Sequence, residues 1–189
     1  MSTVGEGFWG EPGNGKTSLA QQRMIERAGD RACPSIMLDI ERNLRYPGAV
    51  EIRDVPPDRI IDPVWTDGNH IIYSPPRDPA MIEWFFEIVC NGGNVCLLVD
   101  EAHNVAKGEK ASPALLHLCR IRRPQGIDIY FTSTQPQDLH ATAWSVISSC
   151  FVFRTRSAFA LDRLKRERGL TDAQIQAIRN LQPFEYIEC

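Results

Sequence analysis

The sequence predicts an α/β protein with a mainly parallel central sheet and helices on both faces of that sheet. Two observations favour this fold class. Short apolar segments alternate with segments that have the apolar spacing of amphipathic helices. The segment 95–99 is apolar at every position, which is typical of a strand buried on both faces. At 189 residues the chain has the size of one domain, so we expect a single domain over residues 1–189.

The first expected elements are a strand over 4–9 and a helix over 18–28 that ends at Gly29. Between them stands Gly10-Glu11-Pro12-Gly13-Asn14-Gly15-Lys16-Thr17, which matches G-x-x-x-x-G-K-[ST], the phosphate-binding (Walker A) loop. Glycines let backbone N–H groups converge on an anion, and the helix directs its positive dipole end at the same point. Strand, loop and helix occur in the order that the motif requires, so we predict an ATP site.

Within this loop we expect Lys16 to reach the β- and γ-phosphates and the Thr17 hydroxyl to bind Mg²⁺. The residues expected to hold the nucleotide are Gly10, Glu11, Pro12, Gly13, Asn14, Gly15, Lys16, Thr17 and Ser18.

Composition narrows the classes of function. The net charge of −3 argues against a basic nucleic-acid coat, so any DNA contact must come from a local patch or a ring of subunits. No apolar run approaches the ~20 residues that a membrane span needs, and the N-terminus lacks the layout of a signal peptide. The six cysteines lack C-x-x-C and zinc-type spacing, and we expect buried free thiols.

The next expected strands are 35–41, 49–55 and 70–74. Asp39 and Glu41 fall near the carboxyl end of the first of these, where ligands collect in open α/β sheets, but a solvated strand end explains them equally well. The proline-rich stretch 55–68 has the composition of a loop. Trp65 within it is either a core anchor or a partner contact.

Asp78-Pro79 predicts the start of a helix over 80–90, and a buried strand over 94–99 follows. Asp100 and Glu101 stand at the carboxyl end of that strand. In enzymes with this phosphate-binding loop, such an Asp (Walker B) holds Mg²⁺, and the adjacent Glu is placed to polarise the attacking water. His103 either couples nucleotide state to movement or is a structural histidine.

Ser112-Pro113 predicts another helix, which ends in Arg120, Arg122 and Arg123. Arginines at a helix C-terminus are explained either by the helix dipole or by an arginine finger that completes the site of a neighbouring subunit. A buried strand over 127–135 follows. Gln135 at its tip is our candidate for a side chain that contacts the γ-phosphate or the lytic water.

The remaining elements are expected to be a helix over 138–147, a strand over 149–154, helices over 159–168 and 172–181, and a strand over 183–187. The helix over 159–168 is strongly basic although the whole chain is acidic. A solvated face, contact with DNA phosphates and a subunit interface all remain open for it.

With these residues in view, the chain resembles the FtsK/HerA superfamily of DNA-pumping ATPases from Gly10 to Ile187. The segment 116–138 carries the resemblance beyond a generic phosphate-binding loop: Arg123 precedes Gly126, a strand follows, and Thr134-Gln135-Pro136 closes it. The segments 149–156 and 181–187 are similar to the last strands of that superfamily.

The chain looks most like the genome-packaging ATPases of internal-membrane icosahedral viruses. The resemblance implies a RecA-like domain that forms a homo-oligomeric ring, expected to be a hexamer, and drives double-stranded DNA into a procapsid. It also implies contacts with capsid or portal-vertex proteins and with the viral internal membrane or its proteins. The implied location is the host cytoplasm, at the procapsid or the virion vertex.

The same resemblance implies roles for individual residues. It assigns phosphate and Mg²⁺ binding to Lys16 and Thr17, metal binding to Asp100 and water activation to Glu101. It makes Gln135 the sensor and Arg123 the finger that acts in trans. Pro124-Gln125 departs from the superfamily pattern after the arginine, and Arg120 and Arg122 compete for the finger role.

Three other functions share parts of this pattern. A zonula-occludens-toxin-like assembly ATPase of filamentous phages shares the phosphate-binding loop and Asp-Glu-Ala-His, but that family usually adds a membrane segment and a further domain. A P-loop kinase for a small molecule would need neither Glu101 nor an arginine from a neighbour. A nucleotide-gated assembly module would not need the carboxylate that activates water.

Overall fold

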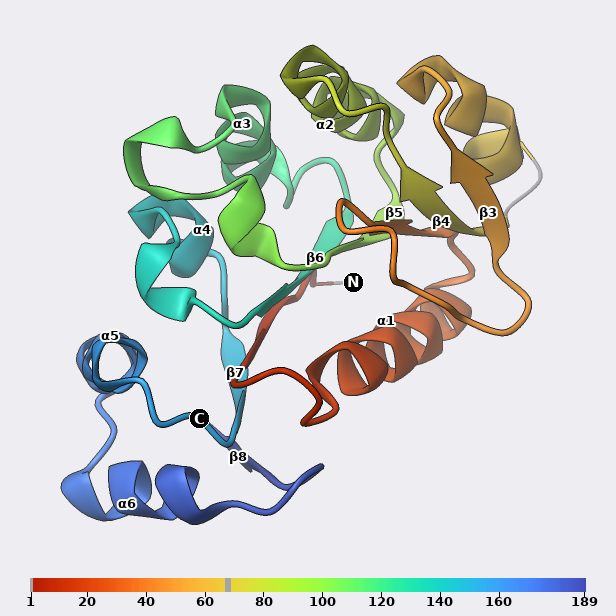
Figure 1. Ribbon diagram of the computed structural model, residues 1–189. Coiled ribbons are helices and arrows are strands. Elements are labelled where there is room, and N and C mark those ends of the chain that lie inside the picture. Colours follow the sequence, from red (N-terminus) through yellow and green to blue (C-terminus); the bar gives the residue numbers. More distant parts are fainter. Residues whose placement is uncertain (1, 67–68) are drawn as a thin grey trace.

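The computed structural model describes residues 2–66 and 69–189, and these build an eight-stranded sheet (Figure 1). The strand order is β3-β4-β2-β5-β6-β1-β7-β8, and its pairs are parallel except for the antiparallel pair β7–β8. The strands are β1 (Gly5–Trp9), β2 (Ser35–Leu38), β3 (Val50–Arg53), β4 (His70–Ser74), β5 (Val95–Val99), β6 (Ile127–Ser133), β7 (Ser149–Phe153) and β8 (Tyr186–Glu188).

Helices cover both faces of the sheet, which confirms the predicted fold class. Figure 1 shows α1 on one face and α2, α3 and α4 on the other. The helices are α1 (Lys16–Arg31), α2 (Pro79–Gly92), α3 (Pro113–Ile121), α4 (Ala141–Ser145), α5 (Ala158–Arg168) and α6 (Asp172–Asn180).

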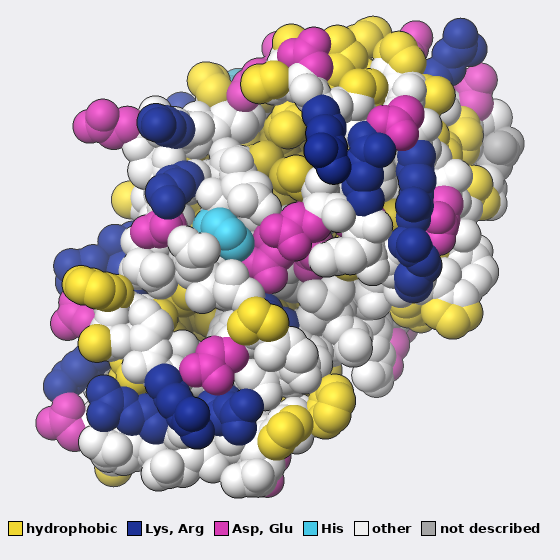
Figure 2. Space-filling model, in the orientation of Figure 1, with side chains coloured by type: hydrophobic (Ala, Val, Ile, Leu, Met, Phe, Trp, Pro, Cys, Tyr) yellow, Lys and Arg dark blue, Asp and Glu magenta, His cyan; other side chains and the backbone are white. Residues whose placement is uncertain are grey.

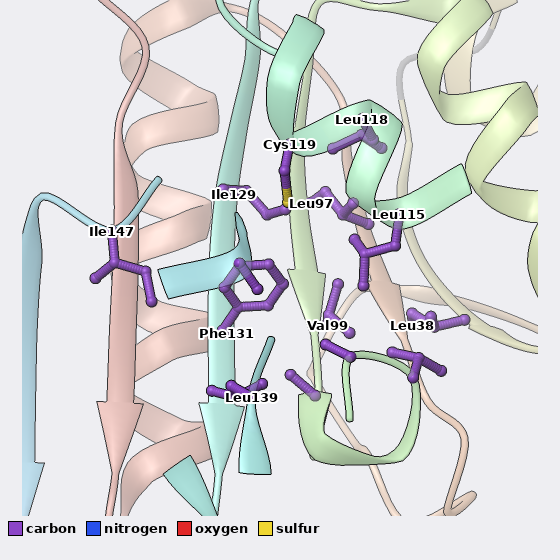
Figure 3. Close-up of a cluster of buried hydrophobic side chains, with 14 of the residues drawn as sticks. Leu38, Leu97, Val99, Leu115, Leu118, Cys119, Ile129, Phe131, Leu139 and Ile147 are labelled. Atoms are coloured by element: carbon purple, nitrogen blue, oxygen red, sulfur yellow. The ribbon is translucent and has the colours of Figure 1, made fainter. Parts of the chain in front are cut away.

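The central strands separate two hydrophobic clusters. Successive side chains of a strand point to opposite faces, so Leu97 and Val99 of β5 join the cluster beneath α3 (Figure 3). Cys96 and Leu98 join the cluster beneath α1. This double coverage explains why β5 is apolar at every position, as its sequence predicted.

A buried ion pair holds α1 to the start of β6. The carboxylate of Asp128 is fully buried and accepts hydrogen bonds from Arg27 Nε at 2.9 Å, Arg31 Nη1 at 2.8 Å and the Val4 N–H at 2.7 Å. Because Arg31 takes part, α1 continues past Gly29, where the sequence predicted its end. The helix is closed instead by Ala32, which adopts a left-handed φ of 49°.

Other predicted boundaries also shift. The second strand ends at Leu38 rather than at residue 41, because Asp39 turns the chain. In the stretch expected to be a loop, short helical turns form at Pro57–Ile60 and Asp62–Thr66. Asp67 and Gly68, at the end of that predicted loop, lie outside the described residues. Trp65 donates its indole N–H to the Gly93 carbonyl at 2.8 Å, so it anchors this segment to the end of α2.

The last predicted strand, over 183–187, is wrong at its start. Pro183 and Phe184 lie in a turn, and the strand begins at Tyr186.

Two further observations concern the cysteines and the length of the helices. All six cysteines are free thiols, and five of them are buried. No helix in the described ranges is long and apolar enough to cross a membrane.

Candidate functional site

The phosphate-binding loop joins β1 to α1 at the carboxyl end of the sheet (Figure 1). Glycine is required at Gly10, where φ is 148° and an added Cβ would lie 2.8 Å from the Cβ of Phe153. Lys16 is only 4% exposed, and its ammonium group donates to the Glu11 carbonyl at 3.1 Å. Burial lowers the pKa of Lys16, although Glu101 and Asp100 oppose this effect. The lysine is therefore held inside the loop, next to both carboxylates.

Asp100 follows β5 and lies directly against this loop. Its Oδ1 accepts hydrogen bonds from the hydroxyl of Thr17 at 3.0 Å and from that of Thr132 at 2.7 Å. Desolvation by burial raises the pKa of Asp100. A buried carboxylate beside a hydroxyl fits Mg²⁺, which prefers oxygen ligands and usually takes one or two carboxylates together with substrate phosphates. Tertiary structure thus brings together the two residues that the sequence assigned to the metal.

Glu101 is fixed in an unusual backbone conformation. Its φ is 44°, in the left-handed region that few non-glycine residues adopt, and its N–H donates to the Thr132 hydroxyl at 3.0 Å. Its Oε2 accepts from the Thr134 N–H at 2.9 Å and the Thr134 hydroxyl at 3.2 Å, and lies 3.2 Å from His103 Nδ1. Strained residues cluster at functional sites.

The electrostatic environment keeps the Glu101 carboxylate ionised. Burial alone would raise the pKa of Glu101. Hydrogen bonds from His103 and Thr134 and the charge of Lys16 outweigh burial, so this pKa lies below its ordinary value. An ionised carboxylate is the form that can accept a proton from water.

His103 links this carboxylate to the end of β6. Its Nδ1 lies 3.0 Å from the Ser133 hydroxyl, and the same hydroxyl accepts the N–H of Gln135 at 2.9 Å. The sequence left two roles open for His103, and the structure connects it to both Glu101 and Ser133, the last residue of β6, two positions before Gln135. Sequence reasoning missed the hydroxyls of Thr132 and Thr134, which donate to Asp100 and Glu101, and that of Ser133, which contacts His103.

These groups line a cavity of about 670 Å³. Figure 2 shows acidic side chains and a histidine gathered in the middle of this face. Glu41, Asn43 and Arg45, from the segment that follows β2, form one wall. The lining residues are Pro12, Gly13, Lys16, Thr17, Ser18, Gln21, Glu41, Asn43, Leu44, Arg45, Asp100, Glu101, His103, Thr134 and Gln135.

The two acidic residues after β2 have different environments. Asp39 is buried and accepts the N–H groups of Asn43 at 3.1 Å and Leu44 at 3.0 Å, so it shapes this wall. Glu41 faces the cavity itself. The sequence could not separate these roles, because both residues only follow a strand.

The three arginines at the end of α3 are also distinguished. Arg122 is buried and donates to Thr3 Oγ1 at 3.0 Å and to the carbonyls of Val4 and Val146, both at 3.1 Å. Its guanidinium is used within the chain. Arg120 and Arg123 are exposed. All three precede β6, whose seven residues extend about 20 Å to the edge that carries Gln135.

Proteins of known structure share this fold. A scan against models of protein families found no match, and a search of curated proteins also found none. Solved structures do match. The genome packaging NTPase B204 from Sulfolobus turreted icosahedral virus 2, in complex with sulfate, has a TM-score of 0.77 at 14% identity, over 99% of this chain and 90% of B204. The fold is that of a RecA-like P-loop NTPase.

Two other solved structures resemble the chain. B204, the DNA-packaging ATPase from Sulfolobus turreted icosahedral virus, has a TM-score of 0.70 at 18% identity, over 100% of this chain and 93% of B204. The N-terminal domain of zonular occludens toxin from Neisseria meningitidis has a TM-score of 0.50 at 18% identity, over 80% of this chain and 76% of that domain.

Proposed function

We propose that this protein hydrolyses ATP and uses the energy to package double-stranded viral DNA into a procapsid. The observation that carries the hydrolytic part is the Glu101 carboxylate, which is kept ionised and fixed at 2.9 Å by the Thr134 N–H in the cavity that Lys16 and Asp100 share. The packaging part rests on the full-length likeness of the fold to B204.

The residues support an in-line attack of water on the γ-phosphate. Lys16 and the N–H groups of the loop hold the phosphates, while Asp100 and Thr17 would hold Mg²⁺, which neutralises charge on the phosphate oxygens. Glu101 accepts a proton from the attacking water. The water oxygen forms a bond to the γ-phosphorus, and the bond between that phosphorus and ADP breaks. Gln135 lines the cavity, and its proposed role is to contact the γ-phosphate or the lytic water and so report hydrolysis.

Arg123 is proposed to act on the neighbouring subunit. It is exposed and lies at the amino end of β6, about 20 Å of strand away from its own cavity. A guanidinium there can complete a site only across a subunit contact, as an arginine finger in trans does. This supports a homo-oligomeric ring, which we propose to be a hexamer, in which residues 1–189 act as one ATPase domain.

The proposed partners follow from the packaging role. They are double-stranded DNA, capsid or portal-vertex proteins, and the viral internal membrane or its proteins, at the procapsid in the host cytoplasm. We expect no DNA sequence preference, because contacts to phosphates carry no base information.

The test is ATP hydrolysis with and without double-stranded DNA at low and moderate salt. We expect stimulation by DNA that fades as salt rises, since contacts to DNA phosphates are salt-dependent. The proposed motor function would be contradicted if DNA did not change the rate of ATP hydrolysis at any salt concentration, in a sample that sediments as a complete ring.

Two alternatives are weaker. A small-molecule kinase would transfer phosphate to an acceptor and has no use for a fixed, ionised Glu101. A zonula-occludens-toxin-like assembly ATPase shares the site, but the likeness to that toxin covers less of the chain than the likeness to B204. ATP hydrolysis without an acceptor excludes the kinase, and DNA stimulation distinguishes the other two.

A further inference from the structure

Phe184 combines two features that are unfavourable for folding. Its side chain is 71% exposed, and its backbone has a left-handed φ of 70°. It occupies the third position of the turn Gln182–Glu185, which is closed by the Glu185 N–H to the Gln182 carbonyl at 3.1 Å. With Pro183 at the second position, this is the pattern of a type II turn, whose third position normally takes glycine. Folding alone therefore does not explain a phenylalanine here.

The turn is attached to the phosphate-binding loop. The Phe184 N–H donates to the carbonyl of Asn14 at 3.2 Å. Its ring covers Gly15, because a Cβ added there would lie 2.7 Å from Phe184 Cδ1. Figure 1 shows the segment before β8 extending to this loop. The exposed ring is thus held against the residue immediately before Lys16.

Other aromatic side chains lie on the sheet side of the same loop. Phe153 Cε1 lies 3.7 Å from the same Cβ position of Gly15. Tyr186, which is 44% exposed, packs against Phe153 and Phe151 with centroid distances of 5.5 and 5.6 Å. The loop is therefore bordered on this side by aromatic side chains.

The strand order decides which end of a nucleotide meets these aromatic side chains. Asp100 and Glu101 follow β5, which lies on one side of β1, whereas Phe184 precedes β8 on the other side. The γ-phosphate must face Glu101, because this carboxylate activates the water that attacks it. The base, at the opposite end of the molecule, then leaves the loop toward β7 and β8.

We propose that Phe184 stacks on the base of the bound nucleoside triphosphate. This deepens the proposed function, since it rests on nucleotide binding by the loop. A phenyl ring offers a flat face and no hydrogen-bonding group. It therefore favours ligands that carry a base over ligands that lack one, and it does not discriminate between different bases. Phe184 is then a binding residue that the motifs of the chain do not include.

The test compares ATP with inorganic tripolyphosphate, which has phosphates and no base. Phe184→Gly removes the ring and supplies the residue that the turn prefers, so the variant should fold at least as well as the unmodified protein. We expect it to bind ATP about tenfold more weakly, which equals about 1.4 kcal/mol, and to bind tripolyphosphate unchanged. Phe159→Ala removes an 80% exposed ring on α5 and should change neither affinity.

A second variant gives a direct signal. In Phe184→Trp the new indole should change its fluorescence when ADP binds and not when tripolyphosphate binds, relative to the unmodified protein with its four tryptophans. The proposal is overturned if Phe184→Gly binds ATP as tightly as the unmodified protein. A subunit contact would then explain the exposed ring. Equal losses for both ligands would also overturn it, since the ring would then only shape the loop. These affinities are measured without DNA, so the result for base stacking does not depend on whether the protein is a DNA motor.

Discussion

Replacing Glu101 by glutamine tests the chemistry of the site with minimal disturbance of its structure. Every hydrogen bond that the side chain accepts ends on Oε2: those from the Thr134 N–H at 2.9 Å, the Thr134 hydroxyl at 3.2 Å and His103 Nδ1 at 3.2 Å. The amide oxygen of a glutamine can take the place of Oε2 and accept the same bonds. Its NH₂ group then takes the place of Oε1.

The expected result is a loss of rate without a loss of binding. General-base catalysis contributes typically 10²- to 10⁴-fold, so Glu101→Gln should raise the barrier by about 3 to 5 kcal/mol. Lys16, Thr17 and Asp100 are untouched, and the dissociation constant for ATP should stay the same.

Single-turnover phosphate release, with the affinity for ATP measured in parallel, checks this expectation. Glu101→Ala serves as the comparison, because it leaves the Thr134 N–H without its acceptor and should also lower the melting temperature. A phosphate-release rate in Glu101→Gln equal to that of the unmodified protein would refute the assignment, and another group would then position the water.

Two further predictions concern the neighbouring groups. Arg123→Ala should lose ATP hydrolysis and regain part of it when mixed with Lys16→Ala, because each subunit supplies what the other's site lacks. If no mixing ratio restores hydrolysis, action in trans is excluded. Asp100→Asn should abolish Mg²⁺-dependent hydrolysis yet raise the melting temperature of the nucleotide-free protein at pH 7. Burial raises the pKa of Asp100 above its unfolded value, so the folded state binds this proton more tightly. Its contribution to stability is therefore greatest below the unfolded pKa and is lost as pH rises through the folded pKa. A lower melting temperature of Asp100→Asn at pH 7, by calorimetry, would contradict this reasoning.

The sequence predicted the phosphate-binding loop and the acidic strand end because each is encoded by adjacent residues. The glycines determine the backbone of the loop, and Lys16 follows them directly. An apolar segment followed by Asp100 and Glu101 defines a buried strand and its carboxyl end. Such local rules need no knowledge of the rest of the chain.

Element ends were harder to predict, because distant contacts determine them. Helix α1 passes Gly29 because Arg31 reaches the buried Asp128, which lies 97 residues further along the chain. The last strand begins at Tyr186, since the turn around Phe184 is attached to Asn14. Neither contact leaves a local signal in the sequence.

The arginines at the end of α3 show the same limit. Three arginines within four positions look alike in the sequence, and each could serve as a finger. The fold buries Arg122 among the carbonyls of Val4 and Val146 and leaves Arg120 and Arg123 exposed. The direction in which each side chain leaves the end of the helix separates them, and packing against β1 sets that direction.

By itself, then, the sequence determined the fold class and the candidate residues for phosphate, Mg²⁺ and water, because these depend on local backbone form and strand burial. Only the tertiary structure decided how they are held. The hydroxyls of Thr17 and Thr132 meet Asp100, and Thr134 and His103 meet Glu101, because β5 and β6 end side by side and β1 lies next to β6. Strand order, which no single segment encodes, brings these groups within hydrogen-bond distance.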